Sequence, residues 1–571
     1  MELIKHYLRP YVKRMILGMS FKMAGTVMEL LLPGLLAYIL DTLIPARNRN
    51  GVFVYGALMI LCALLAWVGN VGANRAAASV ARDSIRTLRH DLFGKITRLR
   101  ASEIDRFTPP SLISRMSTDT YYVYRMIGMM QRIGIRAPIL LLGGIIITMT
   151  LDAALSGLLL ALMPLMGLTV YLISRRGVPL FTRSQEHIDR LTRIVRENLT
   201  GSRIIRALCK TGDEKARFRA ANDEAARSEV LAASTMAVNG PIMSLILNLG
   251  LVLVVFVGAR RVDGHQTEPG VIIAFLSYFT IILNAMLTIT RILTMYSKAL
   301  ASAGRIREVM DAAEEEEAGK AEGIPGAPAV QFDHVSFAYN KQTGQKDVSD
   351  LCFTLEKGQH LGILGPTGSG KSTLIRLLLR LYDADEGTVY VDGRDVRDLS
   401  MSSLRSGIGV VFQNDTVFRG TLGDNVTLGR KVSLEEVERA LRDAQAEGFV
   451  TEKGGVDGAV VSRGHNLSGG QQQRLMIARA LLGGRKILIL DDATSALDYR
   501  TEAALRGRLR EYRDSTVIMI AQRISAVMHC DKILVMEDGE IRGQGTHHEL
   551  MRDCALYREI AALQLGGEDG Q

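Results

Sequence analysis

A lysine, a serine and a threonine close a glycine-rich loop in the second half of the chain. The loop, Gly-Pro-Thr-Gly-Ser-Gly-Lys-Ser-Thr at residues 365–373, follows the apolar run 361–364 and precedes the apolar helical run 374–381. In this context backbone N–H groups and a helix N-terminus surround the phosphates of a nucleotide. We expect Lys371 to neutralise the β- and γ-phosphates of ATP and Ser372 to ligate Mg²⁺. The predicted ATP-binding residues of the loop are Gly365, Thr367, Gly368, Ser369, Gly370, Lys371, Ser372 and Thr373.

A second apolar run, 487–490, ends in two aspartates, Asp491 and Asp492. A carboxylate at the end of a buried strand positions Mg²⁺ in nucleotide-binding proteins of this kind. Asp491 is therefore predicted to act with Ser372 at the metal.

The segment between these two motifs carries a more specific pattern, Leu-Ser-Gly-Gly-Gln, at Leu467, Ser468, Gly469, Gly470 and Gln471. This pattern resembles the signature of ATP-binding-cassette (ABC) ATPases, and the whole chain resembles an ABC exporter half-transporter of the multidrug and lipid branch. The resemblance implies that Tyr339 stacks on adenine and that Gln413 is a glutamine that touches Mg²⁺. It also places Asp498 in the D-loop.

Two positions depart from the family pattern. Asp492 stands where the family has a glutamate that orients the attacking water, and Gln522 stands where it has a histidine. Aspartate is one methylene shorter, and a displacement of about 1 Å can cost about 100-fold in rate. Glutamine can donate a hydrogen bond but cannot carry the positive charge of histidine. The resemblance therefore implies slow hydrolysis, with Asp492 and Gln522 as the catalytic positions.

The intact signature has a consequence for assembly, because ABC cassettes form head-to-tail dimers in which one chain's signature faces the other chain's phosphate loop. This chain would supply an impaired loop side to one site and a good signature to the other. The resemblance thus favours a heterodimer with a second half-transporter, although a homodimer stays possible.

The first 300 residues are rich in apolar side chains, in contrast to the mixed sequence that follows. About 20 apolar residues span a membrane, and we read six such stretches: 15–42, 52–74, 127–150, 153–173, 238–260 and 270–296. The predicted fold is an α-helical membrane domain (1–310), a linker (311–329) and an α/β P-loop NTPase domain of ABC type (330–571).

The intervals 75–126 and 175–237 are long, arginine-rich and helical in pattern, so the positive-inside rule places them in the cytoplasm. We expect them to be extensions of the membrane helices whose tips, near residues 102–107 and 211–215, contact the nucleotide domain. Arg47, Arg49, Arg260 and Arg261 fall on the external side, against the rule, without reversing the count.

The net charge of +9 comes with basic residues concentrated beside apolar stretches, which excludes a nucleic-acid partner and favours membrane lipid. Lys22 and Glu29 share one face of the first span; they either face a polar pathway or reach the membrane interface and a neighbouring helix. The five cysteines lack paired spacing, so neither a metal site nor disulfides are indicated.

Together these features predict a multi-pass protein of the plasma (inner) membrane with a cytoplasmic nucleotide domain. The expected activity is ATP-driven export of a small amphipathic or hydrophobic compound, such as a drug, lipid or peptide. Uptake on the same fold and an ATP-gated channel or regulatory subunit stay open as alternatives.

Overall fold

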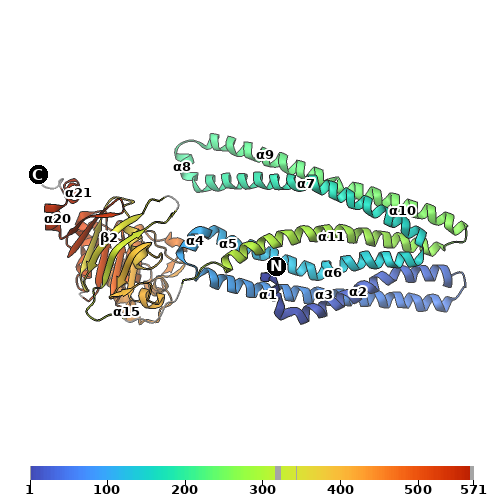
Figure 1. Cartoon of the computed structure of the whole chain (residues 1–571), viewed down its shortest axis with the longest axis horizontal. Coiled ribbons are helices and arrows are strands. Elements are labelled where there is room, and N and C mark those ends of the chain that lie inside the picture. Colours follow the sequence, from blue (N-terminus) through green and yellow to red (C-terminus); the bar gives the residue numbers. More distant parts are fainter. Residues whose placement is uncertain (1, 316–322, 342–343, 513, 566–571) are drawn as a thin grey trace. The chain divides into compact units, whose positions relative to one another are not determined.

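The computed structural model describes residues 2–315, 323–341, 344–512 and 514–565 (Figure 1). The chain divides into two compact units, of which the first comprises Met1–Lys95 and Pro110–Asp311 and the second Ile96–Pro109 and Ala312–Gln571. Residues 316–322 of the predicted linker lie outside the described residues.

The first unit consists of helices, most of them long (Figure 1). Its helices are α1 (Glu2–Leu8), α2 (Val12–Tyr38), α3 (Arg49–Ile96), α5 (Pro109–Ser114), α6 (Thr120–Leu151), α7 (Ala153–Thr200), α8 (Ser202–Ala207), α9 (Thr211–Ala237), α10 (Asn239–Asp263) and α11 (Pro269–Met310). Short 3₁₀ or π-helical turns at Arg9–Tyr11, Ile39–Leu43 and Arg115–Asp119 adjoin α2 and α6.

Six helical segments within the described residues are long and apolar enough to cross a membrane: Glu2–Leu43, Arg49–Ile96, Pro109–Leu151, Ala153–Thr200, Thr211–Asp263 and Pro269–Ile289. The predicted spans lie in these six segments, the last running on within α11. Helices α3 and α7 have 48 residues each, more than twice the length needed to span a bilayer. The prediction of six spanning helices with long extensions is confirmed.

Small residues let the first two spanning helices approach closely. A Cβ added to Gly25 of α2 would lie 3.1 Å from the carbonyl oxygen of Ala66 of α3, and one added to Gly69 would lie 3.0 Å from that of Phe21. Helices in lipid associate mainly through such close packing, because burial of apolar surface gains little there. The glycines at 25 and 69 therefore fix the contact between α2 and α3.

One of the arginines that break the positive-inside pattern has a local partner. Arg261 Nε donates a hydrogen bond of 3.0 Å to Asp152 Oδ2 in the turn between α6 and α7. Asp152 also caps α7, because its Oδ1 accepts from the backbone N–H groups of Ala154 (2.9 Å) and Leu155 (3.1 Å). Arg261, in the last turn of α10, therefore bonds this helix to the turn between α6 and α7.

The second unit is an α/β domain (Figure 1). Its strands are β1 (Val330–Phe337), β2 (Val348–Leu355), β3 (His360–Leu364), β4 (Glu386–Val391), β5 (Arg394–Asp395), β6 (Ile408–Val411), β7 (Gly420–Thr421), β8 (Ala459–Val460), β9 (Ile487–Asp491), β10 (Thr516–Ile520), β11 (Lys532–Glu537) and β12 (Glu540–Gly545). Its helices are α4 (Ala101–Phe107), α12 (Lys371–Leu378), α13 (Met401–Ser406), α14 (Leu422–Thr427), α15 (Leu434–Asp443), α16 (Glu447–Glu452), α17 (Gly469–Leu481), α18 (Tyr499–Leu509), α19 (Ile524–Val527), α20 (His547–Asp553) and α21 (Ala555–Leu565).

The described part of this unit contains a six-stranded sheet in the order β12-β11-β3-β10-β9-β6, parallel except for β12. Leu488 and Leu490 of β9 pack in one core with α17, while Ile487 and Ile489 pack in a second core with α12. Alternate residues of a strand point to opposite faces, so both faces of the sheet are covered. A second sheet, β2-β1-β4-β5, is antiparallel.

One predicted hairpin tip belongs to this second unit. Helix α4 (Ala101–Phe107) carries Asp105, which accepts a hydrogen bond from the hydroxyl of Tyr382. Arg405 forms a bidentate ion pair with Glu315, with N···O distances of 2.8 and 2.9 Å. Both contacts lie within the second unit and bond α4 and the segment before β1 to the rest of the nucleotide domain.

Candidate nucleotide-binding site

The glycine-rich loop connects β3 to α12 and depends on glycine at its ends. Gly370, the residue before α12, has a φ of 91°, a left-handed conformation that favours glycine. A Cβ at Gly365 would lie 2.2 Å from the carbonyl oxygen of Met536 on β11. The loop therefore turns tightly against the sheet and directs its backbone into the cavity beyond the strand ends.

Lys371 is the first residue of α12, and its ammonium lies inside this loop. Its Nζ donates hydrogen bonds to the carbonyl oxygens of Gly365 (2.8 Å) and Pro366 (2.6 Å). Burial lowers the pKa of Lys371, and the carboxylates of Asp491 and Asp492 oppose that shift. The side chain is thus a cation close to a helix N-terminus, which favours an anionic ligand.

Ser372 and Asp491 meet at the end of β9. Ser372 Oγ donates a hydrogen bond of 2.8 Å to Asp491 Oδ2. Neighbouring ligands of an octahedral Mg²⁺ lie about 3 Å apart when each is about 2.1 Å from the ion, so the pair fits that ion. Burial raises the pKa of Asp491, and the hydrogen bond from Ser372 opposes this rise. These two oxygens, with the Gln413 amide, are the candidate ligands.

A cavity of about 230 Å³ brings most of the predicted residues together. It is lined by Asp347, Thr367, Gly368, Gly370, Lys371, Ser372, Thr373, Gln413, Asp491, Asp492, Ile520 and Gln522. The residues come from the ends of β3, β9 and β10, because the carboxyl ends of parallel strands share one edge of a sheet. The cavity thus combines the predicted phosphate-binding loop, the candidate metal ligands and the two departing positions.

The two departing positions are in contact. Gln522 Nε2 donates a hydrogen bond of 3.4 Å to Asp492 Oδ2. Asp492 has a φ of 53°, in the left-handed region that aspartate tolerates better than most residues. Burial raises the pKa of Asp492, opposed by the positive charges of Lys371 and Arg523.

Tyr339 lies beside this cavity, in a second one of about 360 Å³ shared with Tyr382 and Asp105. Its ring meets those of Phe337 and Tyr382 edge-on, with centroids 4.9 and 5.0 Å apart. Its hydroxyl lies 3.4 Å from Thr373 Oγ1. The tyrosine is thus held in place at the edge of the phosphate loop, where a base could stack on it.

The signature residues lie at the start of α17, outside the residues that line the phosphate cavity. Ser468 Oγ accepts from the Gln471 N–H at 3.3 Å, and Gln471 Oε1 accepts from the Ser468 N–H at 3.0 Å, forming a capping box. Leu467 is buried, whereas a Cβ at Gly469 would meet only the Ala496 Cβ, at 3.7 Å. The surface at Gly469 is thus open to a ligand.

The predicted D-loop segment, residues 495–498, is hydrogen-bonded to α17. Gln473 Oε1 accepts from the Ala496 N–H at 2.9 Å, and Gln473 Nε2 donates to Ser495 Oγ at 3.1 Å. Asp498 caps α18, since its Oδ1 accepts from the Thr501 N–H at 2.9 Å. Gln473 therefore holds the start of α17 against the segment that precedes α18.

Sequence reasoning missed two residues near the site. Asp347 lines the cavity, and its Oδ2 accepts from the Tyr339 N–H at 2.8 Å. Arg376 donates a hydrogen bond of 2.9 Å to the Tyr339 hydroxyl and lies over its ring, 5.6 Å from the centroid. Arg376 follows the loop motif on α12, but neither residue belongs to a pattern that would have identified it.

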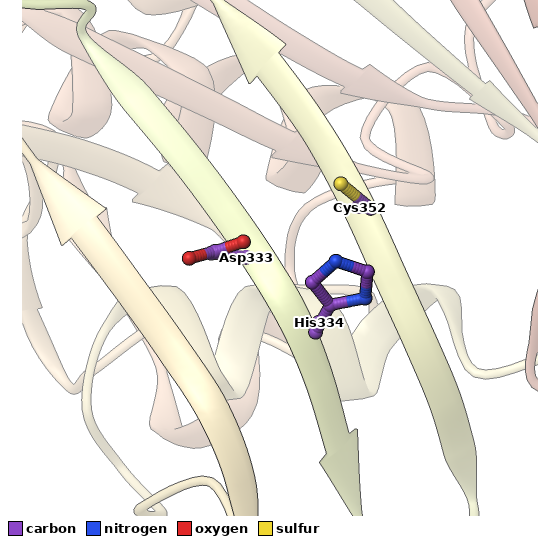
Figure 2. A group of neighbouring side chains, drawn as sticks. All are labelled: Asp333, His334 and Cys352. Atoms are coloured by element: carbon purple, nitrogen blue, oxygen red, sulfur yellow. The ribbon is translucent and has the colours of Figure 1, made fainter.

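Sequence reasoning also missed a group of three side chains of metal-ligating type on β1 and β2 (Figure 2). Asp333, His334 and Cys352 offer ligand atoms within 4.8 Å of one another, all at partly or fully exposed residues. A bulge in β1 causes this, because Phe332 pairs with Phe353 and Val335 with Leu351, which leaves Asp333 and His334 both opposite Cys352. Sequence spacing along one strand could not reveal a group built across two.

Comparisons with known proteins agree with this architecture. The family model of the ABC transporter transmembrane region matches residues 15–286, and the family model described as ABC transporter matches residues 348–495. An uncharacterized ABC transporter ATP-binding protein of Mycobacterium tuberculosis is 35% identical, covering 99% of this chain and 98% of the relative. The chain therefore belongs to the ABC transporter family, as a half-transporter with one membrane region and one cassette.

Two further comparisons indicate which class of ABC transporter this chain resembles. An ATP-dependent lipid A-core flippase of Methylococcus capsulatus is 31% identical, over 86% of this chain and 82% of the relative. The solved structure of a bacterial Atm1-family ABC exporter with ATP bound matches with a TM-score of 0.79 and 26% identity, over 98% of both chains. The fold is that of an ABC exporter, a multi-pass membrane protein with a cytoplasmic nucleotide domain.

Proposed function

We propose that this chain is one subunit of a heterodimeric ABC exporter and supplies the hydrolytically impaired ATP site. The observation that carries the proposal is the pair of Asp492 and Gln522 in one cavity with the phosphate loop and the metal-binding residues. A short carboxylate and a neutral amide replace a longer base and an ionisable ring at the place where water would attack ATP.

The substrate would be a small amphipathic or hydrophobic compound, such as a drug, lipid or peptide, moved outward across the plasma membrane. A relative named as a lipid A-core flippase and a structural neighbour named as an exporter support this direction and substrate type. ATP and Mg²⁺ would bind between the phosphate loop of one chain and the signature of the other. The partner's phosphate loop and this chain's Ser468 and Gly469 would form the competent site.

The test compares the purified chain with the chain co-expressed with a second half-transporter that carries glutamate and histidine at the two positions. The rate of phosphate release per dimer should be small for the chain alone and at least about tenfold higher for the 1:1 complex. A fast, cooperative ATPase from the homodimer would reject the heterodimer. ATP-dependent uptake of a fluorescent lipid into inside-out vesicles tests direction, and solute movement under a nonhydrolysable ATP analogue would instead indicate a gated channel.

A further inference from the structure

We propose that a cavity inside the membrane unit binds the anionic group of an amphipathic substrate. This inference rests on the proposed export function and specifies the chemical class of the compound exported. The cavity has a volume of about 520 Å³ and is lined by residues of α2, α3, α6 and α11. This is the usual size of a small-molecule site, about 300–1,000 Å³.

Positive charge dominates the lining. Lys22, Arg132 and Arg136 face Glu29, which is the only acidic residue among the described residues that line the cavity. Ionisable groups at membrane depth are costly, so they face a cavity and mark a pathway for a substrate or ion. With three cations and one carboxylate, the cavity favours a ligand of negative charge.

One of the three cations is already paired. Arg136 donates a hydrogen bond of 2.6 Å to Glu29 Oε1. The remaining groups of this pair, Glu29 Oε2 and Arg136 Nε, are buried and form no hydrogen bond with any described residue. Buried polar groups normally have partners, and Glu29 holds the guanidinium of Arg136 in place at the wall of the cavity.

The other two cations have only neutral partners in the hydrogen bonds recorded among the described residues. Lys22, a residue that is 5% exposed, donates to Asn70 Oδ1 at 2.7 Å and to Asn74 Oδ1 at 3.5 Å. Arg132 donates from Nε to the carbonyl oxygen of Gly128 at 2.9 Å. Two positive charges therefore remain without a carboxylate, and a carboxylate, sulfonate or phosphate group of a ligand would neutralise them.

Apolar residues also line the cavity, beside the polar Asn74, Asn284 and Thr288, and suit the body of an amphiphile. Ile133, Leu140, Ile281 and Ala285 line it beside the charged residues. Arg132 and Arg136 lie four residues apart and thus on one face of α6. Lys22 and Glu29, seven residues apart, likewise share one face of α2. The cavity therefore offers one ligand both charged and apolar contacts.

A second cavity of the membrane unit is also lined by positively charged side chains. Its volume is about 590 Å³, and its lining includes Arg75, Arg82, Arg89 and two tyrosines, Tyr121 and Tyr124, with no acidic residue among the described lining. Arg75 follows Asn74, which lines the first cavity, so α3 passes from one to the other. This arginine-lined segment would attract an anion toward the first cavity.

The test uses the full-length chain in lipid nanodiscs and a matched set of dansylated C11 probes that end in a carboxylate, a methyl ester or a trimethylammonium group. Trp67, the only tryptophan of the chain, is the energy donor, since it precedes Asn74 by two turns of α3, about 10 Å along the axis. We expect energy transfer, displaceable by undecanesulfonate, with the carboxylate probe bound about tenfold or more tightly than the ester.

Arg132→Gln and Arg136→Gln should each remove most of this preference, whereas Arg125→Gln, an exposed arginine on the same helix beside Tyr121, should leave it intact. Arg132→Glu should shift the preference to the trimethylammonium probe, a gain that misfolding cannot produce. Equal binding of acid and ester, or a preference unchanged in Arg132→Gln and Arg136→Gln, overturns the proposal. If the preference holds but no ATP-driven transport occurs, the anion site stands and the export function fails.

Discussion

Gln522 and Asp492 are joined by a hydrogen bond of 3.4 Å in the nucleotide cavity, and this bond connects the ends of two adjacent parallel strands, β10 and β9. The amide donates to an oxygen of the carboxylate that stands at the predicted water-orienting position. In a competent site the corresponding oxygen would be free to accept a proton from the attacking water. This contact supports the proposal that the site hydrolyses ATP slowly.

Restoring both side chains should restore hydrolysis. We expect Asp492→Glu combined with Gln522→His to raise the ATPase rate of the purified chain by about 10- to 100-fold, because the base regains its reach. Asp492→Glu alone should recover less, since the φ of 53° at this position is less favourable for glutamate. Phosphate release at saturating ATP is the measurement. A double variant no faster than the natural chain contradicts the proposed cause of impairment.

The two halves of the cassette should serve different sites. Gly469→Val should remove most ATPase activity of the complex, because the added side chain would occupy the open surface at the start of α17. Lys371→Ala should reduce nucleotide binding at this chain's own loop but leave measurable turnover. Gly469→Ala is the control, since its Cβ has room at 3.7 Å from Ala496. Equal losses in Gly469→Val and Lys371→Ala would refute this division.

Magnesium-dependent nucleotide binding should weaken in mild acid. Burial raises the pKa of Asp491 above its ordinary value of 3.8, so the carboxyl becomes protonated at a higher pH than usual and loses its ability to ligate Mg²⁺. Binding should therefore be complete near neutral pH and decline as the pH falls toward this raised pKa. Titration of a fluorescent ATP analogue with Mg²⁺ at several pH values measures it. In Asp491→Asn the affinity should be low and its pH dependence reduced.

The hydrogen bond between Tyr382 and Asp105 of α4 should couple substrate binding to ATP hydrolysis. Tyr382→Phe and Asp105→Asn should each reduce substrate-stimulated ATPase activity in the complex while basal activity changes less. The two changes share one contact, so the double variant should be no worse than either single one. Tyr390→Phe, a tyrosine of β4, serves as the control. Additive losses would show that the two side chains act independently.

The external ion pair should stabilise the membrane unit. Arg261→Ala removes the partner of Asp152, whose side chain is 3% exposed, and should cost about 1–3 kcal/mol because a buried charged acceptor loses its donor. Arg260→Ala is a matched control, since Arg260 lies over the ring of Phe256 at 4.7 Å. Thermal unfolding followed by size-exclusion chromatography gives the comparison. Equal melting temperatures for the two variants would contradict it.

Many features of this protein could be predicted from local sequence. Apolar length determines the six spanning helices, since a bilayer requires about 20 residues whatever their order. The loop at 365–373 and the strand that ends in Asp491 are each short and local, so their chemistry follows from residue type and spacing. The contact between Ser372 and Asp491 also follows from the rule that parallel strands end at one edge of a sheet.

Other features depend on residues that meet only in the folded chain. Lys22 and Glu29 could be placed on one helix face from sequence, but Arg132 and Arg136 join them only because α2 packs against α6. His334 and Cys352 meet because a bulge places two residues of β1 opposite one of β2. Sequence periodicity records one element at a time, whereas a cavity's charge is a sum over several elements. The types of elements and the phosphate chemistry were thus determined by the sequence itself, while the composition of the membrane cavity was decided by tertiary packing.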